Sequence, residues 1–540
     1  MIVKGNIVDI HKREIFPGEI EIGNGIIKRI TKTAGKYNEY IIPGFVDSHV
    51  HIESSMLIPS EFASIAVTHG TVATVSDPHE IANVLGIEGI RYMIRNGKKT
   101  PFKFCFGASS CVPATSFETA GAVIDANGIR ELFEKDGLSY LSEMMNYPGV
   151  LFEDPEVIKK IGISKELGKP VDGHAPGLRG SDAKKYVSAG ISTDHECFTL
   201  DEALEKISYG MKILIREGSA AKNFEALHPL ISMHPDMVMF CSDDKHPNDL
   251  VEGHLDKIAA RAVALGYDTF DVLRCASANT VRHYGLRVGL LRENDPADFA
   301  IVEDLNSFKV KQTFIDGVKV SEKGVSAIPR VTEPAVNKFN MKSKSPEDFR
   351  IEARGDSKVR VIEALDGQLI TSELHLRPGC FDGFLVSDTA NDILKITVTE
   401  RYNNGKPAVG FIQNFGLKRG AIASCVAHDS HNVIAVGVSD DDLCRAVNAL
   451  AESKGGICCV DGDEVSVLPL PVAGIMTNED GYITAKKYTE LDMKAKALGS
   501  ELRAPFMTLS FMALLVIPQL KLSDKGLFDG KSFTIVDLQL

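Results

Sequence analysis

The stretch GFVDSHVHIESS, residues 44–55, places two histidines one residue apart directly after an apolar run. In a strand, side chains at positions i and i+2 point to the same side, so His49 and His51 converge on one point. Convergent imidazoles are typical of a metal site. An isolated pair of this kind is more often two surface histidines on an exposed strand end. The rest of the sequence has to decide between these two interpretations.

Length and composition describe an ordinary globular protein with more than one domain. The 540 residues exceed what one core usually holds, so we expect two or three domains. Apolar residues make up 44% of the chain and charged residues 25%, which is unlike a disordered chain or a coiled coil. The formal net charge of −13 and the lack of a clustered basic face argue against a nucleic-acid partner.

Cysteine usage and the N-terminal sequence predict a cytoplasmic protein. The ten cysteines form neither a disulfide framework nor a CxxC zinc ribbon, and we expect reduced, mostly buried thiols. The N-terminus MIVKGNIVDI alternates like a strand and lacks the pattern of a signal peptide. The apolar segment FMTLSFMALLVIPQL, residues 506–520, is shorter than a membrane span and contains Pro518. It predicts a buried helix or a subunit contact, and no membrane partner.

Between residues 43 and 285 the sequence alternates apolar β-rich runs with helical stretches, as parallel βα units do. Eight runs are the number that closes a barrel, so we predict an α/β fold built around a (β/α)8 TIM barrel. The runs are GFVDSHVHIE (44–53), TVATVSDPH (71–79), FKFCFGASS (102–110), SYLSEMMNY (139–147), PVDGHAPG (170–177), ISTDHE (191–196), KILIREGS (212–219) and MVMFCSDD (237–244).

Three further segments surround the barrel. Short alternating strands in residues 1–42 and 286–321 flank it on both sides, and we expect them to pair into one small β-sandwich. Residues 322–346 are rich in Pro, Lys and Ser and read as a linker. Residues 347–540 mix strands and helices, which predicts an additional C-terminal α/β domain. Its helical stretch DDDLCRAVNALAESKGG should end at the glycines.

Polar or titratable clusters follow most of the eight runs, and in a barrel of this kind the strand ends meet at one mouth. Singly, each such residue is more often a turn, packing or salt-bridged residue, but five of eight strand ends carry one that could bind a metal. Together they match a two-metal hydrolytic site, in which both ions acidify one shared water. The predicted ligands are His49 and His51 for one ion and His174 and His195 for the other. Glu143 would bridge both ions, and Asp243 would complete the ligand shell of the first ion.

Several stretches together resemble the adenine deaminases of the amidohydrolase superfamily. An HxH pair alone would indicate only the superfamily, but its combination with HIESSM and DPHEIANV is specific. The motif VAHDSHN, residues 426–432, is similar to one in the characteristic C-terminal domain of these enzymes, so the resemblance covers nearly the whole chain. The stretches are PGFVDSHVHIESSM, DPHEIANV, DGHAPGL, STDHE and CSDDKHP.

The resemblance implies hydrolytic deamination of adenine to hypoxanthine and ammonia in purine salvage, by a hydroxide that bridges two divalent metal ions. It implies Mn²⁺ or Fe²⁺, while the ligand types also accept Zn²⁺. Many superfamily members carry a carboxylated lysine on the fourth strand, but SYLSEMMNYPG contains no lysine, and Glu143 is the only candidate bridge there. The ligands implied by position are His49, His51, Glu143, His174, His195 and Asp243.

Attack of hydroxide on C6 of the purine builds charge on N1, so the reaction needs a proton donor near N1 and a proton for the departing amine. Asp243 can relay one proton, and Asp244, Glu80 or His79 the other; the sequence does not choose among these. His79 and Glu80 could equally well lie at the start of a helix that follows Pro78. Two further strand-end residues are candidate substrate contacts: Ser109 and Arg216.

Other functions stay open on the sequence alone. The same metal cluster could serve a binuclear hydrolase of cyclic amides or N-acyl groups. A non-catalytic metal-binding protein would be indicated by a missing ligand, and none is missing. The stretch HIE fits the HxE motif of zinc nucleobase deaminases, but no PCxxC follows. The polar residues 428–432 could cap the barrel mouth, form an interface in a homo-oligomer, or make a local turn.

Overall fold

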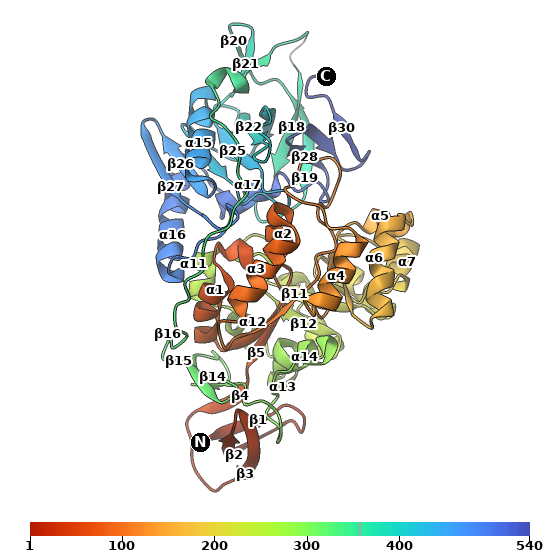
Figure 1. Ribbon diagram of the computed structural model, residues 1–540, viewed down its shortest axis with the longest axis vertical. Coiled ribbons are helices and arrows are strands. Elements are labelled where there is room, and N and C mark those ends of the chain that lie inside the picture. Colours follow the sequence, from red (N-terminus) through yellow and green to blue (C-terminus); the bar gives the residue numbers. More distant parts are fainter. Residues whose placement is uncertain (356–357) are drawn as a thin grey trace.

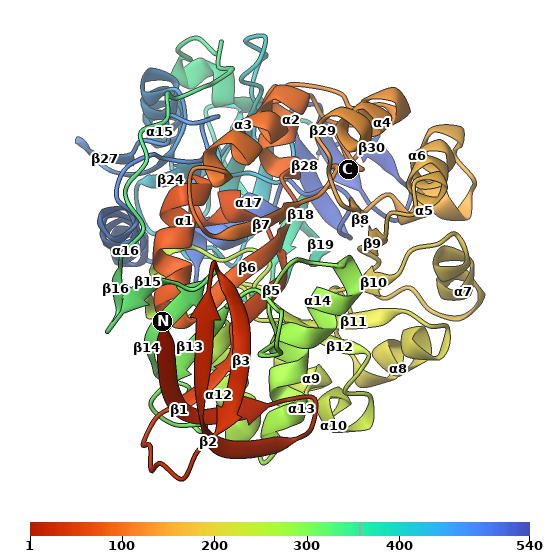
Figure 2. The same cartoon turned by 60° about the horizontal axis from the view of Figure 1, so that its bottom comes forward.

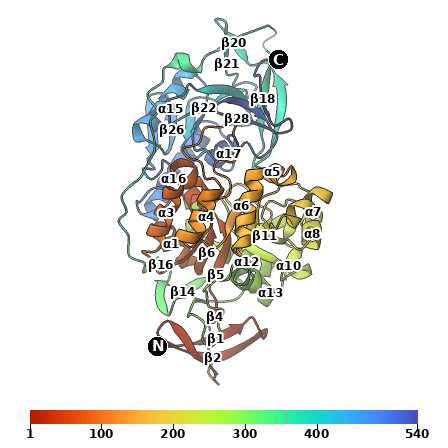
Figure 3. The ribbon, with the colours of Figure 1, turned by 45° about the vertical axis from the view of Figure 1, so that its right-hand side comes forward.

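The computed structural model describes residues 1–355 and 358–540 (Figure 1). An N-terminal sheet lies at one end of the long axis, a ring of strands and helices in the middle, and a C-terminal domain at the other end (Figures 1 and 3). The chain has the mixed α/β content that the sequence predicts. Among the described residues, no helix combines the length and the apolar character that crossing a membrane requires.

The ring contains eight strands, and each predicted run contains one of them (Figure 2). They are β5 (Phe45–Val50), β6 (Thr71–Ser76), β7 (Lys103–Phe106), β8 (Leu141–Met144), β9 (Val171–Gly173), β10 (Thr193–Asp194), β11 (Lys212–Arg216) and β12 (Val238–Cys241). Parallel pairing gives three groups, β5–β6–β7, β8–β9 and β10–β11–β12. The groups are joined, and the last strand is joined to the first, by parallel bridges at Ala108–Leu141, Val171–Ile191 and Val50–Asp243.

Helices separate most of these strands in the sequence and cover the outside of the ring. All residues of β5, β6, β8 and β12 are buried, as expected of parallel strands with both faces covered. The helices are α1 (Pro59–Ala66), α2 (His79–Leu85), α3 (Ile87–Gly97), α4 (Ala126–Lys135), α5 (Tyr147–Leu151), α6 (Pro155–Glu166), α7 (Gly180–Ser188), α8 (Leu200–Ser208), α9 (Phe224–Leu227), α10 (Leu230–Met233), α11 (Pro247–Glu252), α12 (Leu255–Ala264), α13 (Thr269–Leu273) and α14 (Asn279–Tyr284).

The segments before and after the ring form one eight-stranded sheet, with the order β16-β15-β14-β13-β4-β1-β2-β3. Strand β4 joins the two segments, because it pairs in parallel with β1 and antiparallel with β13. An apolar cluster that includes Ile7, Ile20, Phe299 and Phe314 stabilises this junction. The strands are β1 (Ile2–Asp9), β2 (Glu14–Gly23), β3 (Ile26–Lys32), β4 (Tyr40–Pro43), β13 (Phe299–Val302), β14 (Val310–Ile315), β15 (Val318–Glu322) and β16 (Val325–Ser326).

The C-terminal domain is built on a second eight-stranded sheet, with the order β19-β18-β23-β22-β25-β24-β26-β27. These strands are β18 (Val359–Ala364), β19 (Thr371–Leu376), β22 (Leu394–Thr399), β23 (Ala408–Gln413), β24 (Ala421–Ser424), β25 (Val433–Gly437), β26 (Ile457–Asp461) and β27 (Glu464–Leu468). Smaller sheets are formed by β17 (Ile351–Glu352), β20 (Gly379–Phe381) and β21 (Phe384–Val386), and by β28 (Leu520–Ser523), β29 (Gly526–Asp529) and β30 (Thr534–Val536).

Three helices complete this domain: α15 (Asp440–Ser453), α16 (Gly481–Ala497) and α17 (Pro505–Phe511). Helix α15 begins where the Ser439 side chain accepts a hydrogen bond from the Asp442 amide, and the acidic first turn complements the helix dipole. The residue in the left-handed conformation at its end is Lys454, at φ 55°. The prediction that the helix ends at the glycines is therefore wrong by one position. Helix α17, within the apolar segment considered above, is buried along its whole length.

The C-terminal domain packs directly on the ring. One hydrophobic cluster contains ring residues such as Met56 and Ile58 together with Phe506 of α17. Backbone hydrogen bonds cross the same boundary: the Ile58 amide donates to the Thr477 carbonyl at 3.2 Å, and the Thr477 amide donates to the Met56 carbonyl at 2.8 Å. This shared core holds the C-terminal domain over the carboxyl ends of the ring strands.

Candidate metal centre

The six side chains predicted as metal ligands lie together at the carboxyl ends of the ring strands. All are buried, with at most 5% of each residue exposed. They come from the ends of five strands, either within the strand or one or two residues after it. The six are His49 of β5, His51 directly after β5, Glu143 of β8, His174 after β9, His195 after β10 and Asp243 two residues after β12.

His49, His51 and Asp243 form one side of the cluster. The Nε2 atoms of the two histidines lie 3.1 Å apart, and Asp243 Oδ1 lies 3.5 Å from that of His49 and 3.3 Å from that of His51. The bridge between β5 and β12 places Asp243 there, because its amide donates to the His49 carbonyl at 3.0 Å. Asp243 has a φ of 51°, a left-handed conformation that costs about 1 kcal/mol or more and is typical of functional sites.

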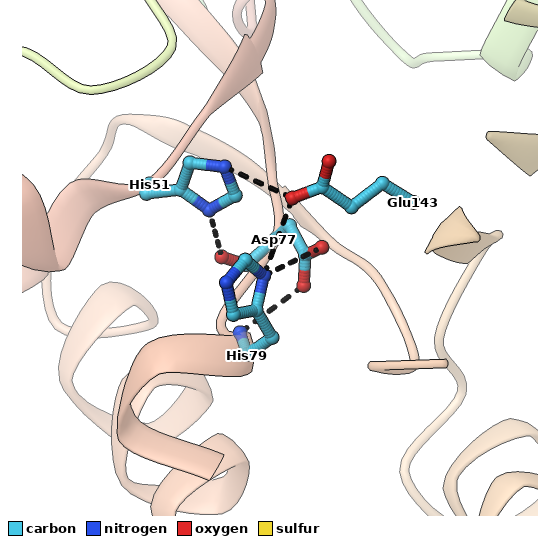
Figure 4. A group of neighbouring side chains, drawn as sticks. All are labelled: His51, Asp77, His79 and Glu143. Carbon is cyan, nitrogen blue, oxygen red and sulfur yellow. Dashed lines mark hydrogen bonds and ion pairs between the residues drawn. The ribbon is translucent and has the colours of Figure 1, made fainter. Parts of the chain in front are cut away.

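The Glu143 carboxylate lies between two groups of histidines. Its Oε1 is 3.2 Å from His51 Nε2, and its Oε2 is 2.7 Å from His174 Nδ1 and 3.3 Å from His195 Nε2. Figure 4 shows the first of these contacts, with Glu143 facing His51 and His79. Burial opposes the charge of Glu143, but the charge and hydrogen bond of His174 hold its pKa well below the usual range. Glu143 is therefore a charged bridge between the two groups.

The donor atoms fit divalent metal ions. Several sets have donor atoms within 4.8 Å of one another, among them His49–His195–Asp243, Glu143–His174–His195 and His51–Asp243–Asp244. Buried polar atoms normally have partners, yet His174 Nε2 has none among the described residues. Imidazole nitrogens with carboxylate oxygens are the donors that first-row divalent metals accept. His195 stacks on His49 with ring centroids 4.1 Å apart, so it lies close to both sides of the cluster.

Asp243 and Asp244 have pKa values shifted in opposite directions. For Asp243, burial works to raise the pKa, but the Arg216 guanidinium, 2.7 Å from Oδ2, and hydrogen bonds from His49 and His51 hold it well below the usual range. For Asp244, burial and the charge of Asp243 raise the pKa. Asp243 is thus a carboxylate, and Asp244 is the better holder of a proton.

The two predicted substrate contacts, Arg216 and Ser109, both bind carboxylates. Both terminal nitrogens of Arg216 contact Glu196, with one distance of 2.9 Å, and one of them also contacts Asp243. Ser109 Oγ donates to Asp77 Oδ1 at 3.3 Å. Each side chain lies behind another residue of the site: Arg216 behind Asp243, and Ser109 behind Asp77.

His79 and Glu80 begin helix α2, and their side chains also join the cluster, so both sequence interpretations apply at once. His79 Nδ1 lies 3.1 Å from Asp77 Oδ2 and 3.4 Å from Glu143 Oε1 (Figure 4). His79 Nε2 lies 3.2 Å from Glu80 Oε1. Asp77, at the end of β6, accepts a hydrogen bond from the His79 amide at 3.1 Å and so fixes the start of the helix.

Residues 427–432 of the C-terminal domain reach the same place. His428 Nδ1 donates to Glu80 Oε1 at 2.5 Å, His431 Nε2 contacts Glu80 Oε2, and Asp429 Oδ1 lies 3.6 Å from His79 Nε2. The cavity between the ring and the C-terminal domain is lined by His51, His79, Glu80, Glu143, Met145, His174, His195, Glu196, Asp243, Asp244, Leu369, His428, Asp429, Phe511 and Leu514.

Sequence reasoning missed several of these residues as parts of the site. Asp77 stands at the second strand end, and Glu196 directly follows His195, so both carried a positional signal. For His428 and Asp429 the sequence offered a cap over the barrel mouth as one of three alternatives, but the motif VAHDSHN did not identify which ring residues they contact.

Comparison with known proteins gives two family matches. Residues 40–320 match the amidohydrolase family, and residues 368–534 match the adenine deaminase C-terminal domain. The chain is 57% identical over 538 residues to an adenine deaminase of Sulfurovum sp., covering 99% of both chains. It is 53% identical to that of Salinibacter ruber (99% of this chain, 98% of the relative) and 50% identical to that of Borreliella burgdorferi (99% of both).

Solved structures match 60% of the chain. A D-hydantoinase of Thermus sp. is 14% identical, with a TM-score of 0.46, and covers 60% of this chain and 96% of its own. A beta-aspartyl dipeptidase of Fervidobacterium islandicum is 16% identical, with a TM-score of 0.46, and covers 60% of this chain and 98% of its own.

Proposed function

The chain belongs to the adenine deaminases of the amidohydrolase family, and we propose that it hydrolyses adenine to hypoxanthine and ammonia at the buried histidine and carboxylate cluster. The observation that carries this proposal is Glu143, whose two oxygens face different histidines at 3.2 Å and 2.7 Å. One carboxylate between two groups of imidazoles is what a two-metal hydrolytic centre requires.

The six ligand residues would hold two divalent ions. When bound, two such ions acidify a shared water, so that hydroxide is available near neutral pH. We propose Mn²⁺ or Fe²⁺, because imidazole and carboxylate donors accept both, and Zn²⁺ fits the same donors. In this proposal His49, His51 and Asp243 serve one ion, His174 and His195 the other, and Glu143 serves both.

Asp243 is the proposed proton relay. It is held as a carboxylate by Arg216 and lies within 3.5 Å of both His49 and His51, so it can accept a proton at the cluster and pass it to the departing amine. Charge that develops on N1 needs a separate donor, and Asp244, His79 and Glu80 all line the cavity. Among these we favour Asp244, which directly follows Asp243 in the chain and whose pKa is raised by burial and by the charge of Asp243.

Arg216 and Ser109 support the reaction indirectly in this proposal. Arg216 orients Asp243 through a charge-assisted hydrogen bond of 2.7 Å. Ser109 orients Asp77, which in turn fixes His79. A direct contact of either residue with adenine would add to these roles.

The domain organisation is part of the proposal. We propose that the ring is a (β/α)8 barrel over residues 43–285, supported by the parallel pairings that link the last strand to the first. Residues 1–42 and 286–321 form the small flanking β-sandwich, supported by the pairing of β4 with β13, and residues 322–346 are the linker, whose first residues add the short edge strand β16 to the same sheet. Residues 347–540 form the C-terminal domain, which caps the ring.

We also propose a cytoplasmic homo-oligomer with adenine, and no nucleic acid, as its partner. All ten cysteines are free, and eight of them are buried, which suits a reducing compartment. The exposed side chains of Val123, Phe152 and Phe381 are apolar surface that subunit contacts would cover. Light scattering on the eluted protein would give its subunit number, and a monomer at micromolar concentration would refute the oligomer.

The deciding experiment measures ammonia release from adenine, adenosine and cytosine by protein purified without oxygen, alongside its metal content. We expect ammonia from adenine, with metal present in proportion to activity. The parallel assay follows acid release from a hydantoin and from dihydroorotate. Acid release from either compound without ammonia from adenine would refute the deaminase proposal in favour of a cyclic-amide hydrolase.

A further inference from the structure

The loop of residues 427–432 belongs to the connection between β24 and β25, and its His428 and Asp429 line the cavity together with residues of the ring. Residues 427–432 are all buried. The loop is fixed by its own backbone, because the His428 amide donates to the Ser510 carbonyl at 3.1 Å and the His431 amide donates to the Ala427 carbonyl at 2.8 Å. His431 has a φ of 54°, a conformation that side chains other than glycine rarely adopt. The loop is therefore a rigid platform for its side chains.

The imidazole of His428 is anchored on two sides. Its Nδ1 donates to Glu80 Oε1 at 2.5 Å, and its ring stacks on Phe511 with centroids 4.7 Å apart and an interplanar angle of 13°. His431 contacts the other oxygen of Glu80, which holds that carboxylate in place. These contacts fix both the position and the tilt of the His428 ring.

The second nitrogen of His428 has no comparable partner. Among the described residues no hydrogen bond reaches Nε2, although only 2% of His428 is exposed. Asp244 Oδ1 lies 3.9 Å from it, beyond hydrogen-bond distance. His428 lines the cavity that also contains the metal-binding cluster. A buried nitrogen that is held rigidly at a cavity and left without a partner indicates a ligand that completes it.

The protonation state of His428 decides whether Nε2 is a hydrogen-bond donor or an acceptor. Burial works to lower the pKa of His428, but the charges of Glu80 and Asp244 outweigh it and raise the pKa to about 9. The geometry agrees with a proton on both ring nitrogens, because Nδ1 faces the Glu80 carboxylate at 2.5 Å and Nε2 faces the Asp244 carboxylate at 3.9 Å; in such a ring Nε2 is a donor. The purine ring of adenine presents acceptor nitrogens at N1, N3 and N7.

We propose that His428 binds adenine directly, donating a hydrogen bond from Nε2 to one ring nitrogen of the purine, and that the C-terminal domain thereby takes part in substrate recognition. This inference rests on the proposed function, because it takes adenine as the ligand. It gives the motif VAHDSHN two tasks: His428 contacts the substrate, and His431 positions Glu80, which orients His428.

The test compares His428→Asn with the native enzyme. The amide nitrogen of asparagine can occupy the place of Nδ1 and keep the contact with Glu80, whereas nothing replaces Nε2. Binding of 1-, 3- and 7-deazaadenine is measured by competition against adenine turnover, since each analogue lacks one ring acceptor. We expect the native enzyme to bind at least one analogue about ten- to a hundredfold more weakly than adenine, and the variant to lose the discrimination against one such analogue.

Controls separate recognition from folding. His375→Asn is the matched control, because His375 is an exposed histidine of the same domain that contacts Glu373 at 2.7 Å. It should leave all three affinities unchanged, and the metal content should be unchanged in both variants. If His428→Asn does not fold, His428→Gln carries the test, since its longer amide can still donate at the position of Nε2 but without charge. We expect the glutamine variant to retain a weakened preference against the same analogue.

Unchanged discrimination in a folded, metal-loaded His428→Asn or His428→Gln variant would overturn this inference and leave His428 with a structural role. A native enzyme that releases no ammonia from adenine would overturn the proposed function itself, and with it the assignment of adenine to His428. The two failures are distinguishable, because the first is seen only in an enzyme that turns adenine over.

Discussion

The ring and the 427–432 loop each bring buried histidines to the same cavity, but they use them differently. The ring histidines present nitrogens that converge on the carboxylates of Glu143 and Asp243, within 2.7–3.5 Å. The loop histidines, His428 and His431, instead contact the Glu80 carboxylate, and the His428 ring stacks on Phe511. In the functions proposed above, metal binding belongs to the ring, and the C-terminal domain supplies substrate recognition and closure. Substitutions on the two sides should therefore change different measured quantities.

The largest effect is expected for Glu143→Gln on the ring side. The neutral amide cannot bridge two cations, so metal content should fall and turnover should drop by roughly a thousandfold or more. Metal analysis and ammonia release measure both. The control is Glu118→Gln, because Glu118 is equally buried beside the loop and burial raises its pKa to about 8, so the change removes little charge. A fully metallated and active Glu143→Gln variant would contradict the bridging role.

Asp243→Asn should separate proton transfer from metal binding within the ring. The amide cannot relay a proton, so turnover should fall by roughly two to four orders of magnitude. The five other ligands stay in place, and much of the metal should be retained. The pair of measurements is kcat with adenine and metal content per chain. Near-normal turnover would instead transfer the relay to Asp244.

Arg216→Lys is expected to have an intermediate effect. Lysine keeps the positive charge but cannot bind Glu196 through two nitrogens while also reaching Asp243, so Asp243 loses its fixed orientation. We expect kcat to fall about ten- to a hundredfold with metal content close to native. Arg261→Lys, in a partly exposed pair with Glu217, provides the matched control. Equal kinetics in the two variants would show that Arg216 has no positioning role.

The smallest effect concerns the C-terminal side and is a pH dependence of stability. Lys521 is fully buried, and its Nζ donates to the carbonyls of Leu369 at 2.6 Å and Phe511 at 3.0 Å, two residues that line the cavity. Burial lowers its pKa to about 7, below the value of about 10.4 for an unfolded lysine. Between these values the unfolded chain binds more protons, so this group makes the free energy of unfolding rise with pH.

Lys521→Met should remove that rise. Denaturant unfolding at pH 7 and pH 9 should show about 1–2 kcal/mol less increase in the variant than in the native protein, with metal content unchanged. Lys525→Met, at an exposed position that follows the same strand, is the control. A variant whose stability keeps the native pH slope would show that Lys521 is not the group responsible. A loss of metal in the variant would show that a substitution in the C-terminal domain also affects the metal-binding residues of the ring.

The sequence predicted which side chains of the ring lie close together, for a physical reason. Each strand ends in the residues that face the mouth, so the spacing in DSHVH and the polar ends of the other runs already carry the geometry. The contacts of Arg216 were not predictable, because Glu196 and Asp243 become its neighbours only after three strands have paired. The reach of His428 to Glu80 depends on how two domains pack, which no local pattern specifies. The left-handed Lys454 shows the same limit at a single residue.

Strand β4 has a consequence for the order in which the chain matures during synthesis. It lies between β1 and β13, which are about 300 residues apart, and at roughly 5–20 residues per second the second neighbour leaves the ribosome on the order of 10–50 s after β4. During that interval β1, β2 and β3 can pair locally, while one edge of β4 stays open. An open edge is a template for pairing with another nascent chain. The first segment to be made is thus among the last to be completed, and slow translation would prolong its exposure.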